Sequence, residues 1–524
     1  MHDTLLLWLI LVPLLGAFLC IPLSERLSKS LALVTSLVGL CLGVILYTQF
    51  DASQVEKFQL VLSWPWIRSF NINFALGIDG LSFPLVILTK FMMPIAILAS
   101  WNEDRRARAF MICYLFLDVA MTGTFLATDI FLFYVFWELM LIPMLLLIGV
   151  WGSKDRIYAA LKFFLYTFVG SILMLVAIFY LFGHFQAQHG AYTSQISSFY
   201  HMAFDPDARL FGLNAQAWIF LAFALAFAIK VPMFPLHTWL PDAHVQAPTG
   251  GSILLAAVLL KMGTYGLLRF AIPIAPEAFR FFTPGIVVLS LIGIIYGAWV
   301  AFQQTDFKKL VAYSSVNHMA FVTLGICAFN VQSMSGAMMQ MINHGLSTGA
   351  LFLLVGMLYE RRHTRNFNDF GGIASILPFY SFFLVFVACS SMGVPGLNGF
   401  VGEFLVLIGT YLANPLWGMV ATTGVIFGSI YMLFMIRRVL FGPVTSAENR
   451  GLKDLSPREW AAILPLGIFI VLLGVYPQPL MNKFQPTLAK YLTDISVPQV
   501  PANKVSEVKV VAPPVDSPME ENHE

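Results

Sequence analysis

The segment LAFALAFAIKVPMFPLHTWLPDAHVQAPTGG, residues 221–251, begins as an apolar helix and is then interrupted. Lys230 ends the apolar run, and Pro232 and Pro235 follow directly. Proline lacks a backbone donor and clashes with the preceding turn, so a helix should end or bend at this point. A charge buried in lipid is costly, so a charge beside a helix break indicates a functional site.

The composition is that of a polytopic membrane protein. The chain has 524 residues, of which 58% are hydrophobic and 11% charged. Apolar runs of about 20 residues recur, and each is long enough to cross a hydrocarbon core of about 30 Å. We therefore expect the lipid bilayer to surround most of the chain.

The sequence lacks the features typical of several classes of partner and cofactor. The net charge is +2 and the basic residues are scattered, which argues against a nucleic-acid partner. The five cysteines lie singly in apolar runs without a CxxC pair, so we expect no iron–sulfur or zinc site and assign them to packing. A dinucleotide-binding GxGxxG after a strand is also missing, so redox cofactors are expected in other chains.

Apolar runs between polar segments predict an all-α fold of fourteen membrane spans. Their approximate bounds are 4–23, 30–50, 77–99, 110–127, 129–151, 162–183, 215–236, 251–270, 283–302, 309–329, 334–358, 374–412 (interrupted), 416–438 and 459–477.

The distribution of Lys and Arg predicts the orientation. Eighteen of the thirty fall in odd-numbered loops, nine fall on the opposite side and three lie within spans. By the positive-inside rule, the odd-numbered loops face the cytoplasm and both termini are periplasmic in a bacterial inner membrane. The first apolar run has no positive segment before it, so it is interpreted as a span and not as a cleaved signal.

Spans 7 and 12 are interrupted in similar ways. Span 7 contains KVPMFP (230–235) and span 12 contains GVPGLNGF (393–400). The breaks lie five spans apart, and a unit with an odd number of crossings inverts when it is repeated in tandem. We therefore predict two inverted five-helix repeats with discontinuous helices 7 and 12. The predicted divisions are 1–109 (helices 1–3), 110–270 (helices 4–8), 278–440 (helices 9–13), 441–477 (a cytoplasmic loop and helix 14) and 478–524 (a disordered periplasmic tail).

Four charged residues are expected near the membrane midplane. Glu138 lies nine residues into its span, about 14 Å at ~1.5 Å per residue. Lys261 is ten residues into its own span, Lys230 stands at the first break and Glu403 follows the second. Each such charge costs at least ~2.5 to 3.5 kcal/mol on insertion scales, so we predict that the four transfer protons. Buried ion pairs that only hold helices together, such as Glu138 with Lys230, remain the alternative.

Histidines extend this set. His318 and His344 each lie about ten residues into their spans, and His237 and His244 follow the break in span 7. All are candidates for proton transfer, although neutral histidines also serve as bonds between helices or as loop anchors. For Lys90, Asp79, Asp118 and Asp129, structural pairing or an interfacial position is at least as good an interpretation.

Four stretches resemble the antiporter-like membrane subunits of proton-pumping NADH:quinone oxidoreductase, respiratory complex I, and most closely those of the M type. The similarity covers spans 4–13, while the first three spans and the tail match mainly by hydropathy. The stretches are IFLFYVFWELMLIPMLLL (130–147), KVPMFPLHTWLPDAHVQAPTGGSILLAAVLLKMGTYGLLRF (230–270), QMINHGLSTGALFLLVGMLYERRHTR (340–365) and NGFVGEF (398–404).

The resemblance implies a fourteen-helix subunit with a half-channel in each repeat. It implies that Glu138 is the partner of Lys230, the lysine that carries the proton at the break. It also implies that Lys261 continues the polar axis. It also implies that His318 and His344 link the two halves and that Glu403 carries the proton in the second half.

The M type is favoured because Glu403 stands where the other antiporter-like subunits typically carry lysine, and because no long lateral helix follows span 14. By the same resemblance, FMN, iron–sulfur clusters and quinone are expected in partner subunits. The neighbouring antiporter-like subunits are expected as partners.

Three functions follow as hypotheses. The first is a proton-translocating subunit that couples electron transfer from NADH to quinone, in partner subunits, to proton transfer across the membrane. The second is a subunit of a multisubunit sodium/proton antiporter. The third is a passive scaffold whose buried charges only fix the packing of helices.

Overall fold

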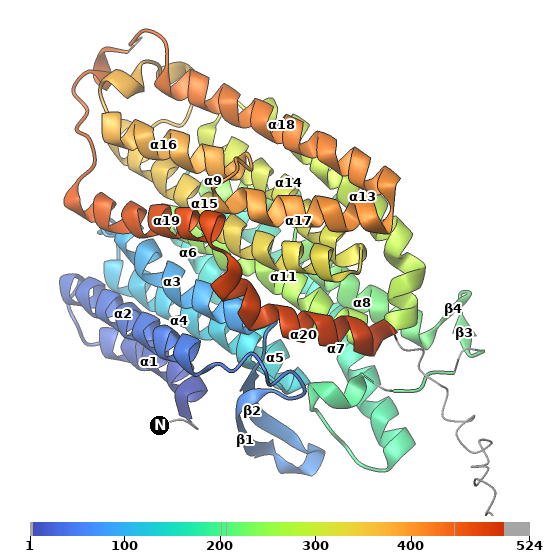
Figure 1. The fold of residues 1–524 in the computed structure, drawn as a ribbon. Helices are drawn as coiled ribbons and strands as arrows, with labels where there is room; N and C mark the ends of the chain where they lie inside the picture. Colours follow the sequence, from blue (N-terminus) through green and yellow to red (C-terminus); the bar gives the residue numbers. More distant parts are fainter. Residues whose placement is uncertain (1–3, 201, 206, 445, 497–524) are drawn as a thin grey trace, which may run out of the picture.

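The computed structural model describes residues 4–200, 202–205, 207–444 and 446–496, and most of its helices run side by side (Figure 1). The helices of the first half are α1 (Leu5–Cys20), α2 (Glu25–Gln49), α3 (Phe83–Ala99), α4 (Ala107–Leu126), α5 (Ile130–Leu139), α6 (Leu141–Trp151), α7 (Arg156–His189), α8 (Ala215–Lys230), α9 (Trp239–Gln246), α10 (Thr249–Leu254), α11 (Leu260–Gly266) and α12 (Ile272–Ile274). Those of the second half are α13 (Pro276–Phe302), α14 (Phe307–Cys327), α15 (Val331–Arg362), α16 (Pro378–Ser391), α17 (Asn398–Ala413), α18 (Pro415–Leu440), α19 (Pro457–Val475) and α20 (Gln478–Ser496).

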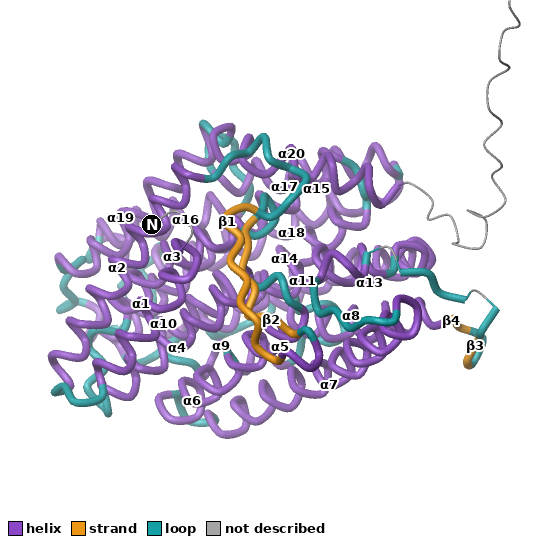
Figure 2. Tube along the Cα trace, turned by 90° about the horizontal axis from the view of Figure 1, so that it is seen from below, coloured by secondary structure: helices purple, strands orange, loops and turns teal. Residues whose placement is uncertain are grey.

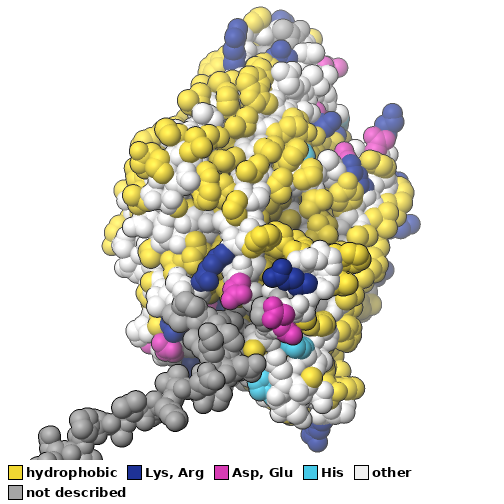
Figure 3. Space-filling view, turned by 90° about the vertical axis from the view of Figure 1, so that its right-hand side faces the viewer, with side chains coloured by type: hydrophobic (Ala, Val, Ile, Leu, Met, Phe, Trp, Pro, Cys, Tyr) yellow, Lys and Arg dark blue, Asp and Glu magenta, His cyan; other side chains and the backbone are white. Residues whose placement is uncertain are grey.

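The bundle is that of a multi-span membrane protein. Within the described residues, ten helical segments are long and apolar enough to cross a bilayer. Five shorter apolar helices accompany them: α1, α3, α8, α16 and α17. Hydrophobic side chains predominate on the face seen in Figure 3, and charged side chains gather in a few places on it.

The spans fall into an inner and an outer group. The most apolar stretch of α15 and that of the segment Thr249–Ile274 are 100% buried inside the chain, and that of α14 is 94% buried. The corresponding stretches of α7, α13, α18 and α19 are only 39% buried, because their outer faces are left for lipid or for other subunits. The inner group therefore contains the spans that carry Lys261, His318 and His344.

The helices break at both proline sites. The helix α8 ends at Lys230 and α9 begins at Trp239, with Pro232 and Pro235 between them. The helix α16 ends at Ser391 and α17 begins at Asn398.

The second break depends on two glycines. The φ angle is 72° at Gly393 and 90° at Gly396, a region that residues with a Cβ atom rarely adopt. Glycine enters this region without a steric penalty, so these two residues allow the chain to leave α16 and turn into α17.

Other irregularities were not predicted. The fifth predicted span is interrupted at Met140, between α5 and α6. Two π-helical segments, Leu255–Leu259 and Leu267–Ala271, separate α10, α11 and α12. Such wide turns disturb the regular pattern of backbone hydrogen bonds and recur at functional sites.

The all-α expectation needs a correction, because two β-hairpins lie outside the helices. Strands β1 (Gln59–Ile67) and β2 (Ile72–Ile78) pair antiparallel, with Gln59 opposite Ile78, and Figure 2 shows this hairpin in orange along one face of the bundle. The shorter β3 (Arg209–Leu210) pairs with β4 (Leu213–Asn214). The first hairpin is rich in β-branched and aromatic residues, which favour strands, so α3 begins at Phe83 and not at the predicted residue 77.

The expectation of a disordered tail from residue 478 is wrong for its first part. Residues 478–496 form α20, which follows α19 and crosses the bundle obliquely (Figure 1). The helix buries one apolar stripe at helical spacing, made of Met481, Phe484, Leu488, Leu492 and Ile495. The rest of the tail is rich in Pro and Val and determines the average composition of the whole segment. The helical spacing of these five apolar residues was therefore not recognised. The rest of the predicted tail, residues 497–524, lies outside the described residues.

Candidate functional site

Lys230 is a buried cation held without an ion pair. Its side chain ends α8, the residue is 1% exposed, and Nζ lies 3.2 Å from the sulfur of Met140. The ring centroids of Trp137 and Phe163 lie 5.3 and 5.5 Å from Nζ, close enough for cation–π attraction. Among the described residues, no carboxylate lies within 4.0 Å of it. The ammonium group is therefore free to exchange a proton without first breaking a salt bridge.

Glu138 lies near Lys230 but does not touch it. The carboxylate is half-buried on α5, and its Oε1 atom is buried without a hydrogen-bond partner in the described part of the chain. The two residues interact electrostatically, although they form no direct pair. Instead, the Met140 sulfur lies against Nζ of Lys230. A direct Glu138–Lys230 pair is thus not the arrangement in the structure.

Lys261 is joined to His344. Its Nζ atom lies 2.5 Å from the carbonyl oxygen of Ala256 and 2.6 Å from Nδ1 of His344. Ala256 belongs to the π-helical segment Leu255–Leu259, whose wide turn presents that carbonyl to the lysine. An ammonium group only donates, so Nδ1 accepts and the His344 proton is assigned to Nε2. That Nε2 atom is buried and has no partner among the described residues.

His318 is joined to Glu403. Its Nδ1 atom lies 2.9 Å from Oε1 of Glu403, and the amide of Gln340 donates to the same oxygen over 3.0 Å. On its other side, Nε2 of His318 lies 3.3 Å from the hydroxyl of Tyr431. The rings of His318 and His344 are 5.9 Å apart between centroids. Four spans thus contribute to one series of groups, which we call the midplane chain: Lys261, His344, His318 and Glu403.

A small polar cavity lies inside the midplane chain. Its volume is about 10 Å³, which is at the lower limit for one water molecule. Both histidines and Glu403 line it, together with Ser390 and Ser391 from the last turn of α16. One water in this cavity would bridge the gap between the two histidine rings. The cavity therefore lies between α14, α15 and the helix ends on either side of the second break.

Gly402 permits the close contact between α15 and α17. A Cβ atom at this position would clash with Oε1 of Gln340 and would lie 2.9 Å from the Gln340 backbone nitrogen. Without a side chain at Gly402 the two helices approach closely enough for Gln340 to reach Glu403.

The histidines near the first break are not joined to the midplane chain by hydrogen bonds among the described residues. His237 is buried in the break, with its ring near those of Phe234 and Tyr296. His244 on α9 stacks on Phe352 with a centroid distance of 4.4 Å. Both ring nitrogens of each histidine are buried without a partner in the described residues. Such unsatisfied polar atoms are rare in folded proteins, which makes both residues candidates for contact with water.

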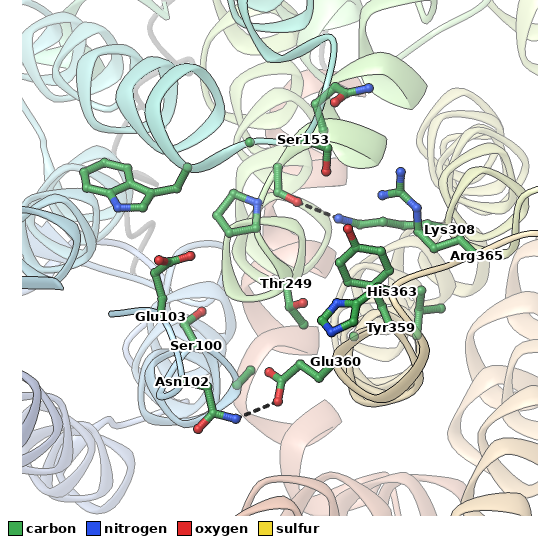
Figure 4. Close-up of a pocket in the computed structure, with 18 of the residues that line it drawn as sticks. Ser100, Asn102, Glu103, Ser153, Thr249, Lys308, Tyr359, Glu360, His363 and Arg365 are labelled. Atoms are coloured by element: carbon green, nitrogen blue, oxygen red, sulfur yellow. Dashed lines mark hydrogen bonds between the residues drawn. The ribbon is translucent and has the colours of Figure 1, made fainter. Parts of the chain in front are cut away.

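A larger polar cavity opens where the loops after α3, α6, α9 and α15 meet. It has a volume of about 450 Å³. Figure 4 shows Lys308 and Arg365 on one side of it and Glu103 and Asn102 on the other. Lys308 is buried and donates to the carbonyl oxygen of Ala247 over 2.6 Å. The cavity reaches the end of α9, and the sequence did not predict it.

The remaining buried charges have structural partners. Lys90 and Asp118 form an ion pair of 2.8 Å in which both side chains are buried, and Lys90 also donates to the carbonyl oxygen of Leu9. Asp79 pairs with Arg269 at 2.5 Å. Asp129 caps α5 by accepting from the backbone of Phe131 and Leu132. These contacts agree with the structural interpretation of Lys90, Asp79, Asp118 and Asp129.

Some contributors to the site were missed. Gln340 could have been found, because it lies four residues before His344 and so shares its helix face. Met140 and Tyr431 gave no signal, since single apolar or aromatic residues are common in spans. No cluster of three or more His, Cys, Asp or Glu residues that could hold a metal ion occurs in the described ranges.

Two family models match the chain. The model described as "NADH:quinone oxidoreductase/Mrp antiporter, TM" matches residues 127–428, and that described as "NADH-ubiquinone oxidoreductase chain 4, amino terminus" matches residues 6–124. NADH-quinone oxidoreductase subunit M of Rhodobacter capsulatus is 44% identical over 476 residues, which cover 89% of this chain and 91% of the relative. The subunit M of Pseudomonas aeruginosa is 43% identical, with coverage of 91% and 95%. NADH-ubiquinone oxidoreductase chain 4 of Arabidopsis thaliana is also 43% identical, with coverage of 90% and 94%.

Solved structures show the same fold. A chain of respiratory complex I from Thermus thermophilus with bound NADH superposes with a TM-score of 0.84 at 31% identity, covering 95% of this chain and 100% of that one. A chain of the Mrp complex from a Dietzia species has a TM-score of 0.77 at 22% identity, covering 94% of this chain and 52% of that one. The second likeness concerns the fold alone.

Proposed function

The chain belongs to the NADH-quinone oxidoreductase subunit M family, and from this premise we propose that it carries protons across the membrane through the midplane chain. Its relatives are subunits of an enzyme complex, so the chain acts as one membrane subunit of that complex. The observation that carries the proposal is the continuity of Lys261, His344, His318 and Glu403, which come from four spans and lie within reach of one another.

Each group in the midplane chain can pass a proton to the next. Lys261 donates at Nζ to Nδ1 of His344, and His344 then releases its Nε2 proton into the small cavity. A water there takes the proton to His318, which passes it from Nδ1 to the carboxylate of Glu403. Burial of these groups excludes bulk water, which favours proton transfer along this series.

Lys230 and Glu138 form the first half of the route. Lys230 has no ion pair among the described residues and Glu138 has an unsatisfied oxygen, so both can bind and release protons without breaking a salt bridge. The polar cavity with Lys308 is the site of proton uptake, and His244 lies near enough to both Lys308 and Lys261 to interact with them electrostatically. Proton transfer then runs from the cytoplasm, on the side of the basic loops, to the periplasm.

We further propose fourteen crossings arranged in two inverted repeats. The ten long segments and five shorter helices of the described residues give this number if α16 and α17 are the two halves of one span. Both termini then lie on the periplasmic side of a bacterial inner membrane. FMN, iron–sulfur clusters and quinone belong to partner subunits, where electrons pass from NADH to quinone, and the neighbouring antiporter-like subunits adjoin this chain.

Proton pumping by the assembled complex tests the proposal. We expect Lys230→Ala or Glu138→Gln to reduce NADH-driven proton uptake into vesicles by at least about tenfold, because each removes a proton-transferring group. Glu25→Gln, at an exposed carboxylate at the start of α2, is the matched control and should pump normally. Full pumping in both variants would contradict the relay.

A sodium/proton antiporter subunit is the second candidate, favoured by the family model whose description includes the Mrp antiporter. It would belong to a complex driven by an ion gradient and not by electrons. Purification of the native complex separates the two functions, because the oxidoreductase shows flavin and iron–sulfur absorbance and the antiporter shows neither.

A further inference from the structure

An apolar groove lies on the side of the bundle, and no residue of the midplane chain lines it. It has a volume of about 350 Å³, within the ~300 to 1,000 Å³ range of small-molecule sites. Its walls come from α2, α3 and α19, one end comes from Pro479 and Leu480 of α20, and its floor comes from α15. Residues from all five helices line it, among them Leu40, Val44, Phe91, Leu346, Phe469 and Leu472.

The groove extends along α2 and α19, from the C-terminal ends of these helices towards their centres. Tyr47 and Tyr476 lie at its mouth, near the ends of α2 and α19. Leu40 and Phe469 lie seven residues further in on the same two helices, about 10 Å at ~1.5 Å per residue. Tyrosines at the mouth and apolar residues below match the order of interface and hydrocarbon in a bilayer.

The floor is the helix that carries His344. Ile342 and Leu346 line the groove, and they lie four residues apart on one face of α15. His344 lies between them in sequence and so points to the opposite face, where it bonds to Lys261. Whatever fills the groove therefore packs against the back of the midplane chain.

Lys483 is a cation at the mouth of the groove. Nζ of Lys483 on α20 lies 5.4 Å from the ring centroid of Tyr47 and donates to the carbonyl oxygen of Phe50 over 2.7 Å. Asp51 is near enough to interact electrostatically, but no carboxylate of the described residues lies within 4.0 Å of Lys483. By contrast, Lys490 on the same helix pairs with two carboxylates. An ammonium group has three donors, so Lys483 retains donors for an anion.

We propose that the groove binds an anionic phospholipid, with one acyl chain between α2 and α19 and the phosphate beside Lys483. The groove lies at the depth of the hydrocarbon, its lining is apolar, and the cation at its mouth complements a phosphate. This inference goes beyond the proposed function and does not depend on it.

Photo-crosslinking tests the site in the purified complex. The probe is phosphatidylglycerol with a diazirine in its acyl chain, present as a minor component of phosphatidylcholine vesicles. We expect labelling of the α19 peptide around Leu472 and of the α2 peptide around Val44. In Leu472→Trp the indole fills the groove, so labelling of the α2 peptide should fall to the level of bulk lipid.

Two further variants separate the acyl site from the headgroup site. Ile468→Trp, one turn away on α19, 56% exposed and outside the groove, is the matched control and should leave labelling unchanged. Lys483→Gln should reduce the preference for phosphatidylglycerol over a phosphatidylcholine probe by about fivefold, the effect of one lysine near an anionic surface. If Leu472→Trp fails to assemble, Val44→Trp fills the groove from α2.

Three results would overturn the proposal. Equal labelling in Leu472→Trp and Ile468→Trp would mean that only bulk lipid was detected. Equal labelling by both probes in the native complex would show that the groove has no site for an anionic headgroup. A photoreactive residue at position 472 that crosslinks to a partner subunit, and not to lipid, would show that protein covers the groove.

Discussion

Two lysines buried in the same bundle have opposite environments. Lys90 pairs with Asp118 at 2.8 Å and also donates to a backbone carbonyl, so its charge is satisfied. Lys230 has a sulfur atom and two aromatic faces as its contacts. Burial alone therefore does not distinguish a structural charge from a functional one, but the partners of the charge do.

Removing these two charges should have opposite effects on stability. Lys90→Met leaves Asp118 buried and unpaired, so we expect a loss of about 3 to 5 kcal/mol. Lys230→Met removes a charge that has no ion-pair partner in the described chain, and insertion costs of ~2.5 to 3.5 kcal/mol per charge predict an unchanged or increased stability. Thermal release of the subunit from the purified complex measures both. Similar destabilisation in the two variants would show that Lys230 is a structural charge.

At this scale the sequence predicts positions better than partners. The depth of Glu138, Lys261, His318 and His344 in their spans follows from counting residues between polar segments. The contact of Lys230 with Met140 does not, because it depends on the interruption between α5 and α6. The direct pair of Glu138 and Lys230 that the sequence suggests is not formed.

At the scale of helices, the contact between α15 and α17 should depend on Gly402. In Gly402→Ala the Cβ atom would lie 2.9 Å from the Cα atom and the backbone nitrogen of Gln340, so the helices must separate. We expect a loss of about 1 to 3 kcal/mol from overpacking, together with reduced proton pumping. The measurements are thermal stability of the complex and NADH-driven proton uptake.

Gly285→Ala in α13 is the matched control for that change. A Cβ atom at position 285 would meet nothing within 4 Å, so only helix propensity acts and stability should rise by about 0.5 to 1 kcal/mol. If Gly402→Ala behaves like Gly285→Ala, close packing of α15 and α17 does not position Gln340 against Glu403.

Elements with a local cause are predictable, and elements with a distant cause are not. The breaks near Pro232 and Pro395 follow from backbone chemistry at those residues. The helix α20 is stabilised by burial of its apolar stripe against the bundle. The hairpin β1–β2 lies in a loop between apolar runs, where the sequence predicts no element. The π-helical segment before Lys261 depends on packing around it and leaves no mark in the sequence.

At the scale of the whole molecule, the orientation can be tested by labelling. Phe211, in the loop between β3 and β4, is 89% exposed, and Arg450 is exposed in the loop before α19. We expect an impermeant maleimide to label Phe211→Cys in intact cells and Arg450→Cys only after permeabilisation. The reverse pattern would place the basic loops outside.

The overall architecture is largely predictable because lipid imposes it. Backbone groups in a bilayer must be satisfied within helices, so the positions of apolar runs determine most of the fold. The polar cavity around Lys308 is not predictable, since its walls come from loops that are far apart in the sequence.

Glu403→Gln provides the most direct test of the midplane chain. Glutamine keeps the shape of the side chain and an oxygen that accepts from His318 and Gln340, but it cannot carry a proton. The measurement is the number of protons pumped per NADH oxidised by the reconstituted complex, alongside the yield of assembled complex. We predict normal assembly with a clearly lowered ratio. Impaired assembly with an unchanged ratio would contradict proton conduction through Glu403 and support a scaffold.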